Sequence, residues 1–194
     1  SIVIWSLGNE AGPGDVFKAC TAAVKARDLS RPVQYERNNW FTDMGSRQYP
    51  TVQWMWDCAL ARDGMYHVQK DNPLRYPFHV NEYAHNMGNA MGNFAEYWDV
   101  FYTYDSLSGG CIWDWADQAV WTETPHGRAL AYGGDFDDQP NDGPFCNNGV
   151  VDGARRVTPK LLEMAHVQRN LVVRRGKNGG FVLENRHCFT NADE

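Results

Sequence analysis

Short apolar segments that alternate with helical segments are the feature that most constrains the fold of this chain. Five segments have the composition of buried strands, at residues 2–7, 32–35, 43–49, 76–81 and 110–115. Helices are expected at 15–27, 93–104 and 159–170. Strands that alternate with helices form βα units, in which the strands pair in parallel. The sequence therefore predicts an α/β fold, with its chemistry in the loops that follow the strands.

Several local features refine this prediction. Asp15 is expected to cap the first helix, with an apolar stripe formed by Val16, Ala19, Cys20, Ala23 and Val24. The segment 2–7 is β-branched, as expected for a strand that is buried on both faces. Around Trp54 and Trp56 we expect irregular structure, and over 117–153 a long loop rich in Gly and Asp. Trp115 is expected to pack in the core.

Charge and cysteine content exclude several classes of function. The chain has 18 Lys and Arg against 24 Asp and Glu, a net charge of −6, which argues against a nucleic-acid partner. No segment approaches the roughly 18 apolar residues of a membrane span. The five cysteines include no CxxC pair, which favours reduced thiols over disulfides or a zinc site. Reduced thiols favour the cytoplasm but leave the compartment open.

The aromatic content is high and has two interpretations. Phe, Trp and Tyr make up 13% of the residues, and eight of them are Trp. Such side chains can fill a core, or they can form flat platforms on which the apolar face of a sugar ring packs. Composition alone leaves both interpretations open.

Two glutamates share the same sequence context. Glu10 and Glu82 each follow an apolar strand segment, and each comes directly after an asparagine. Glycoside hydrolysis needs two carboxylates across one bond, one to protonate the leaving oxygen and one to attack or to activate water. Two glutamates in ordinary surface loops remain the alternative for this pattern.

Longer motifs around these glutamates resemble glycoside hydrolase family 2, and within it the large bacterial β-galactosidases. The similar segments are 6–10 (SLGNE), 30–36 (SRPVQYE), 81–89 (NEYAHNMGN), 109–115 (GGCIWDW), 131–136 (AYGGDF) and 140–149 (PNDGPFCNNG). The resemblance implies about strands 4 to 8 of a (β/α)8 TIM barrel over 1–172. A linker and the first strands of a following β-sandwich domain are expected over 173–194.

The resemblance also implies an activity, the retaining hydrolysis of terminal β-D-galactosides such as lactose. Glu82 is then the nucleophile and Glu10 the general acid/base. Retention requires these carboxyl groups to lie about 5 Å apart, against roughly 6.5–9.5 Å for inversion.

Further site residues follow from the same resemblance. Asn9 is expected to bind the sugar 2-hydroxyl, Tyr49 to lie beside the nucleophile, His85 to contact ring hydroxyls and Trp113 to form the floor under the galactose. Asp142 is expected at the sugar pocket. The neighbours of Tyr49, which include Arg47, Gln48 and Pro50, depart from the family pattern.

Two metal ions are implied, and both sites are expected to be incomplete in this chain. Glu10 is expected to ligate Mg²⁺, together with residues that lie before Ser1. The carbonyl of Phe145 and the side chain of Asn148 are expected to ligate Na⁺. A carbonyl and an amide oxygen are hard neutral ligands, which suit a monovalent cation.

Alternative functions remain. Family 2 also holds enzymes of other specificity, such as β-glucuronidase and β-mannosidase, although an Asn-x-Lys motif typical of glucuronidases is not found. A non-catalytic carbohydrate-binding fragment is a further possibility. The expected partners are the substrate, the rest of the barrel, flanking sandwich domains and, at full length, further copies of the same protein. We expect these 194 residues alone to be inactive.

Overall fold

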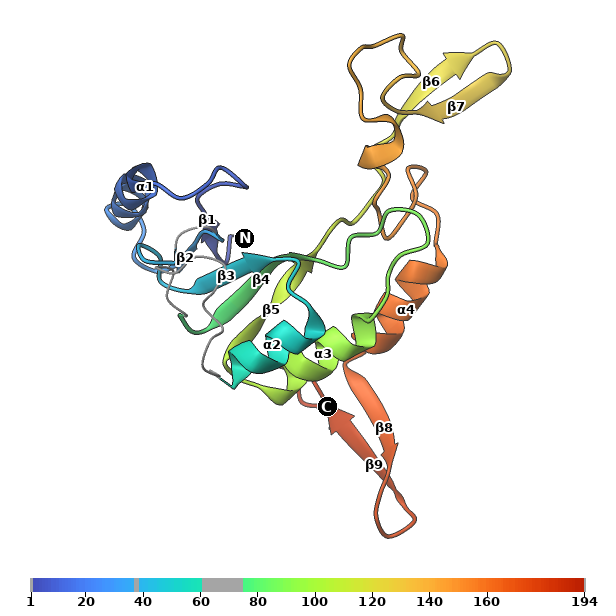
Figure 1. The fold of residues 1–194 in the computed structure, drawn as a ribbon. Helices are drawn as coiled ribbons and strands as arrows, with labels where there is room; N and C mark the ends of the chain where they lie inside the picture. The colour runs from blue at the N-terminus through green and yellow to red at the C-terminus, as the bar shows by residue number, and fades with distance from the viewer. Residues whose placement is uncertain (1, 37–38, 61–74, 194) are drawn as a thin grey trace.

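The computed structural model describes residues 2–36, 39–60 and 75–193 (Figure 1). Five strands belong to the α/β part: β1 (Trp5–Ser6), β2 (Val33–Gln34), β3 (Gly45–Gln48), β4 (Phe78–Tyr83) and β5 (Leu107–Ile112). The helices are α1 (Asp15–Lys25), α2 (Val52–Ala59), α3 (Phe94–Thr103) and α4 (Pro159–Val167), with a 3-10 turn η1 (Gly143–Cys146). Two hairpins complete the chain: β6 (Val120–Thr124) with β7 (Gly127–Ala131), and β8 (Leu171–Arg175) with β9 (Phe181–Asn185).

The first five strands pair in parallel, as the alternation of strands and helices predicts. β1 pairs with β2, and β3, β4 and β5 form a three-stranded sheet in that order. Asp43 connects the two sheets, because its backbone nitrogen donates to Val33 O at 3.0 Å and its Oδ2 accepts from Val33 N at 2.8 Å. The parallel α/β class is therefore confirmed.

The main core lies between the three-stranded sheet and the helices α2 and α3, which Figure 1 shows on one face of that sheet. Met55 and Cys58 of α2, Phe78 and Val80 of β4, and Phe94 of α3 are fully buried there. Burial of each large apolar side chain contributes roughly 1.5–3 kcal/mol. The core thereby fixes which side chains of β4 face the helices. The candidate nucleophile, Glu82, lies on the same strand.

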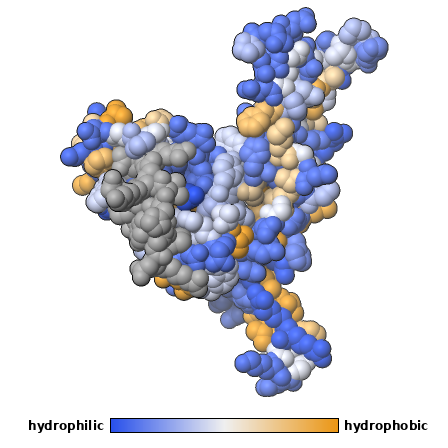
Figure 2. Space-filling view, in the orientation of Figure 1, coloured by the Kyte–Doolittle hydropathy of each residue, from blue (hydrophilic) through white to orange (hydrophobic). Residues whose placement is uncertain are grey.

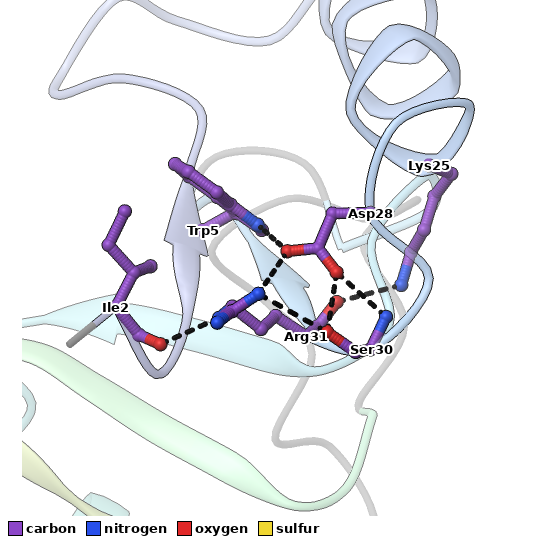
Figure 3. A network of polar contacts seen from close by, with 6 residues as sticks. All are labelled: Ile2, Trp5, Lys25, Asp28, Ser30 and Arg31. Carbon is purple, nitrogen blue, oxygen red and sulfur yellow. Dashed lines mark hydrogen bonds and ion pairs between the residues drawn. The ribbon is translucent and has the colours of Figure 1, made fainter.

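A polar cluster joins the chain before α1 to the chain after it (Figure 3). Asp28 accepts hydrogen bonds from Trp5 Nε1 at 2.8 Å, from the Ser30 hydroxyl at 2.6 Å and from Arg31 Nη1 at 2.7 Å. The bonds from Ser30, Trp5 and Arg31 hold the pKa of this carboxyl well below its usual range. Arg31 Nε also donates to Ile2 O at 2.7 Å. This cluster fixes β1, and with it the loop that carries Glu10.

The predictions for the first strand and helix were partly wrong. Ile2 and Val3 are exposed, because they precede β1 and lie outside the strand pairing of Trp5 and Ser6 with β2. Asp15 is the first residue of α1 and makes no capping hydrogen bond, since Gly14 holds the cap position. Val16 is 63% exposed, whereas Phe17 is buried and stacks on Tyr35 with ring centroids 3.9 Å apart. The helix therefore docks through Phe17 rather than through the predicted stripe.

Three further predictions were wrong. The region around Trp54 and Trp56 is helix α2, which Thr51 caps by accepting a hydrogen bond from Trp54 N at 3.1 Å. The predicted loop over 117–153 contains the hairpin of β6 and β7. Trp115 is 55% exposed, because it lies beyond the end of β5 and outside the helix-covered core.

The last hairpin exposes apolar side chains. β8 and β9 are antiparallel and extend away from the three-stranded sheet (Figure 1). Leu171, Val173 and Phe181 are exposed, and Figure 2 shows apolar residues along this hairpin. The assignment of 173–194 to a following β domain stays a prediction. Within the described part of the chain, no helix is long and apolar enough to cross a membrane.

Candidate active site

The candidate residues gather beyond the carboxyl ends of the parallel strands. The loop after β1 carries Glu10, Gln48 ends β3, Glu82 lies near the end of β4, and Trp113 follows β5. In α/β barrels this edge of the sheet is where catalytic residues come together from separate strands. Side chains that are distant in sequence thereby become neighbours.

A register shift turns Glu82 out of the core. Phe78 and Val80 point toward the helices, and regular alternation would send Glu82 the same way. The pairing of β3 with β4 skips one residue before Gln48 meets Glu82, and the pairing of β4 with β5 also shifts between Val80 and Tyr83. Tyr83 takes the core position instead. Bulges of this kind re-aim side chains beside active sites.

Glu82 is buried and held by two neighbours. Its carboxylate Oε1 accepts a hydrogen bond from Gln48 Nε2 at 2.8 Å, and its backbone oxygen accepts one from Tyr49 N at 2.8 Å. The residue as a whole is 9% exposed. A buried carboxylate with a fixed orientation is suited to attack on one position of a bound substrate.

Glu10 lies on a loop that is held by hydrogen bonds to residues just after β2. Its backbone has a positive φ of 49°, and its nitrogen donates to Glu36 Oε1 at 2.9 Å. The Tyr35 hydroxyl accepts from Ala11 N at 3.1 Å and donates to Gly12 O at 2.9 Å. The Glu10 residue itself is exposed, so its carboxyl group is open to solvent. Glu36 and Tyr35 lie in the 30–36 motif, but no local pattern in that motif indicates that they hold the Glu10 loop in place.

The carboxylates of Glu82 and Glu10 both affect the pKa of the Tyr49 phenol. Burial raises the pKa of Tyr49, and a hydrogen bond to Glu82 and the charges of Glu82, Glu10 and Asp114 raise it further. Glu82, Glu10 and Asp114 are thus the carboxylates whose charges act on this phenol. The Tyr49 hydroxyl therefore stays protonated and donates a hydrogen bond to Glu82 across the neutral pH range.

The cluster continues from Tyr49 to three further candidates, His85, Phe145 and Asn148. The Tyr49 and His85 rings have centroids 6.0 Å apart, and those of His85 and Phe145 are 5.8 Å apart. Asn148 Nδ2 donates to Phe145 O at 3.1 Å and lies 3.5 Å from His85 Nε2. Tyr49 and His85, expected at the sugar, and the two residues expected for sodium are thus brought together.

Trp113 is anchored through its backbone. Its nitrogen donates to Tyr83 O at 2.9 Å, and its oxygen accepts from Asn86 N at 2.9 Å. The peptide bond between Trp113 and Asp114 is cis. The two hydrogen bonds to Tyr83 and Asn86 fix Trp113 just after β5, beside the loop of His85.

Asp142 is the least connected of the candidate site residues that the structure describes. It is exposed, and within the described chain its carboxylate makes no hydrogen bond or ion pair with the other candidates. Its backbone oxygen accepts from Phe145 N at 3.2 Å, which places it at the start of η1. Its role at the sugar pocket stays a prediction.

Lys160 is a supporting residue that sequence reasoning missed. From α4 its Nζ donates to Asn86 O, and it lies 3.3 Å from Gly149 O. These carbonyls adjoin His85 and Asn148 in sequence, so Lys160 ties their two loops together. A lysine on an amphipathic helix gives no sequence signal for such a contact.

The residues expected for sodium fit a cation in one respect. Asn148 is 3% exposed, and its buried Oδ1 has no hydrogen-bond partner among the described residues. A buried oxygen without a donor is costly unless an ion or water satisfies it. For magnesium, the described chain offers no group of three or more His, Cys, Asp or Glu side chains, and one exposed carboxylate at Glu10 is too few ligands.

Comparisons with known proteins agree with this architecture. Residues 1–173 match the family described as glycosyl hydrolases family 2, TIM barrel domain. A β-galactosidase of Klebsiella pneumoniae is 43% identical over 175 residues, which cover 87% of this chain and 17% of that protein. A β-galactosidase of Priestia megaterium is 37% identical over 195 residues, which cover 98% of this chain and 18% of that protein.

A solved structure shows the same fold. The family 2 β-galacturonidase of Eisenbergiella tayi, determined with galacturonate, matches with a TM-score of 0.53 and 19% identity. The match covers 88% of this chain and 34% of the enzyme. The chain spans less than a fifth of the length of the two curated relatives. It belongs to glycosyl hydrolase family 2 and is part of the TIM barrel domain of that family.

Proposed function

We propose that the whole protein hydrolyses terminal β-D-galactosides with net retention, and that this chain supplies the nucleophile and the acid/base. One observation carries the proposal. Glu82 is buried under the amide of Gln48 and beside the Tyr49 phenol, whose pKa the Glu10 carboxylate also raises. Two carboxylates around one phenol, at the carboxyl ends of parallel strands, match the requirement of glycoside hydrolysis.

In the first step Glu82 attacks the anomeric carbon while Glu10 gives its proton to the glycosidic oxygen. The bond to the aglycone breaks, and a galactosyl ester of Glu82 forms. In the second step Glu10 removes a proton from water, which attacks the same carbon, and the Glu82 carboxylate leaves. The Tyr49 hydroxyl stabilises that leaving carboxylate by donating a hydrogen bond.

The remaining contacts of the sugar follow the family resemblance. Asn9 binds the 2-hydroxyl, a contact that strengthens in the transition state. His85 contacts ring hydroxyls, and Trp113 forms the floor of the pocket. The contact between the rings of His85 and Tyr49 supports this role for His85.

We further propose that Phe145 and Asn148 hold a sodium ion. The oxygens of these residues lie in one short segment, and the buried Asn148 Oδ1 needs a positive partner. A cation bound there supplies a fixed positive charge beside the His85 loop. We expect the KM of the whole protein to fall when K⁺ is replaced by Na⁺, and Asn148→Ala to abolish that difference. Magnesium remains a proposal for the whole protein, with Glu10 as its ligand from this chain.

The activity is tested on the whole protein with an aryl β-D-galactoside. We expect the first product to be the β-anomer of galactose, observed by proton NMR before mutarotation. Glu82→Gln is expected to abolish turnover, whereas Glu123→Gln, which changes an exposed residue of β6, is expected to leave it unchanged. Release of the α-anomer would reject the retaining mechanism.

The same purified whole protein also distinguishes two alternative functions. A higher kcat/KM for an aryl β-glucuronide or β-mannoside than for the galactoside would assign the other family specificity. Undiminished turnover in Glu82→Gln, or sugar binding without any turnover in the wild-type protein, would support a carbohydrate-binding role instead.

A further inference from the structure

One side-chain nitrogen connects two candidate residues that come from different strands. Gln48 Nε2 lies 2.8 Å from Glu82 Oε1 on β4 and 2.8 Å from Asn9 Oδ1 on the loop after β1. Gln48 itself ends β3, beside the register shift that brings it opposite Glu82. The sequence marked this position only as a departure from the family pattern around Tyr49.

The chemistry of this bridge fixes the orientation of both amides. A nucleophilic carboxylate accepts hydrogen bonds, so Gln48 must present its nitrogen to Glu82. The same nitrogen faces Asn9, so Asn9 must present its oxygen. The Asn9 nitrogen, which has two hydrogens to donate, is therefore turned away from Gln48 and is available to a substrate hydroxyl.

The bridge also restrains the carboxylate of Glu82 through one of its two oxygens. Oε1 accepts the hydrogen bond of Gln48. A hydrogen bond to a charged acceptor is stronger than a neutral one and limits rotation of the carboxylate. The hydrogen bond from Tyr49 N to Glu82 O restrains the backbone of the same residue. The carboxylate is thus oriented before substrate arrives, which is the form of positioning that raises reaction rates.

We propose that Gln48 is a positioning residue that orients the nucleophile Glu82 and, through the same amide, turns the nitrogen of Asn9 toward the 2-hydroxyl of the sugar. This inference rests on the proposed function, because it assumes the assigned roles of Glu82 and Asn9. It adds that the two roles are coupled through one donor.

Gln48→Met tests the proposal, because it keeps the length of the side chain and removes the donor. We expect kcat/KM for an aryl β-galactoside to fall about 10- to 100-fold in the whole protein, the size expected for loss of a hydrogen bond to a charged group. A residue with a merely structural role would produce a loss that is independent of the sugar. The decisive measurement is therefore the ratio of kcat/KM for the galactoside to that for its 2-deoxy analogue.

That ratio is expected to fall about tenfold in Gln48→Met, because the Asn9 amide is no longer held toward the 2-hydroxyl. Asn9→Ala is expected to lower the ratio in the same way. In the double variant the second substitution is expected to have little further effect on the ratio, since both remove one coupled contact. Gln53→Met is the matched control, because Gln53 is exposed on α2 and its amide bonds to Asp57.

The outcomes separate the inference from the proposed function. An unchanged ratio in Gln48→Met, or additive effects of the two substitutions, would overturn the positioning role while the galactosidase activity stands. Absence of galactoside hydrolysis by the wild-type protein would overturn the proposed function itself. Gln48→Glu, which keeps the shape and polarity of the side chain but presents acceptors to Glu82, is expected to lower the ratio as well. It replaces Gln48→Met if thermal melting shows that the latter does not fold.

Discussion

The backbone nitrogen of Glu10 donates a hydrogen bond to Glu36 Oε1 at 2.9 Å, so the loop of the proposed acid/base is held by the end of the neighbouring strand. Glu10 adopts a positive φ of 49°, a region that side chains other than Gly seldom occupy. The strand β2 places Glu36, and β1 places Glu10, so the parallel pairing of these strands sets the position of the acid/base.

The first prediction concerns this brace. Glu36→Ala removes the acceptor, and we expect the Glu10 loop to shift, with kcat of the whole protein reduced about 10- to 100-fold and KM changed less. Glu36→Gln keeps an acceptor and is expected to retain most of the activity. Steady-state kinetics on an aryl β-galactoside measure both, with Glu163→Ala on the exposed face of α4 as the control. Equal losses in the two Glu36 variants would contradict the role of the hydrogen bond.

The second prediction concerns the protonation of Tyr49. Burial and the charges of Glu82 and Glu10 raise the pKa of its phenol, so the hydroxyl stays protonated well above pH 10. The tyrosinate absorbance that appears between pH 9 and 11 is therefore expected to be the same in the wild-type protein and in Tyr49→Phe. A smaller signal in the variant would show that Tyr49 ionises in that range.

The third prediction concerns the hydroxyl of Tyr49 in catalysis. Tyr49→Phe removes a donor to the carboxylate that leaves in the second step, so we expect that step to slow about 10- to 100-fold. The galactosyl-enzyme is then expected to accumulate, detected by mass spectrometry of the quenched reaction. Tyr102→Phe, which alters an exposed ring of α3, serves as the control. No accumulation together with an unchanged kcat would reject this role.

The fourth prediction concerns the pH dependence of stability. The pKa of Asp28 is lowered by hydrogen bonds from Ser30, Trp5 and Arg31, so its ionised form stabilises the folded state at pH values above its unfolded pKa of about 3.9. That stabilisation is lost as the pH falls through the lowered pKa of the folded state. We expect Asp28→Asn to lower the Tm of the whole protein at pH 7 and to have less effect near pH 2. Asp105→Asn, at an exposed position, is expected to leave the Tm unchanged at both pH values.

The fifth prediction concerns the chain in isolation. Ile2 and Val3 are exposed, and the parallel strands among the described residues form separate two- and three-stranded sheets that do not close into a barrel. Open sheet edges favour association with other chains over a rigid site. We expect the purified 194 residues to show no turnover of an aryl β-galactoside. Turnover that Glu82→Gln abolishes would contradict this expectation.

The sequence determined the elements that depend on local pattern. Strands recur at apolar segments, so the sequence predicts the parallel α/β class that the structure confirms. Polar motifs follow the strand ends, and they are the basis on which Glu10 and Glu82 are proposed as the catalytic pair. Motif resemblance to the family named Asn9, Tyr49, His85, Phe145 and Asn148, and the structure brings these residues near one another.

The tertiary structure decided what depends on contacts between distant segments. Regular alternation along β4 would bury Glu82 among Phe78 and Val80, and the register shift against β3 and β5 turns it toward the site. Gln48, Glu36 and Lys160 act through hydrogen bonds to partners 26 to 74 residues away, which no local pattern records. Trp115 was wrongly expected in the core for the same reason, since burial depends on which neighbours cover a residue and not on its own hydrophobicity.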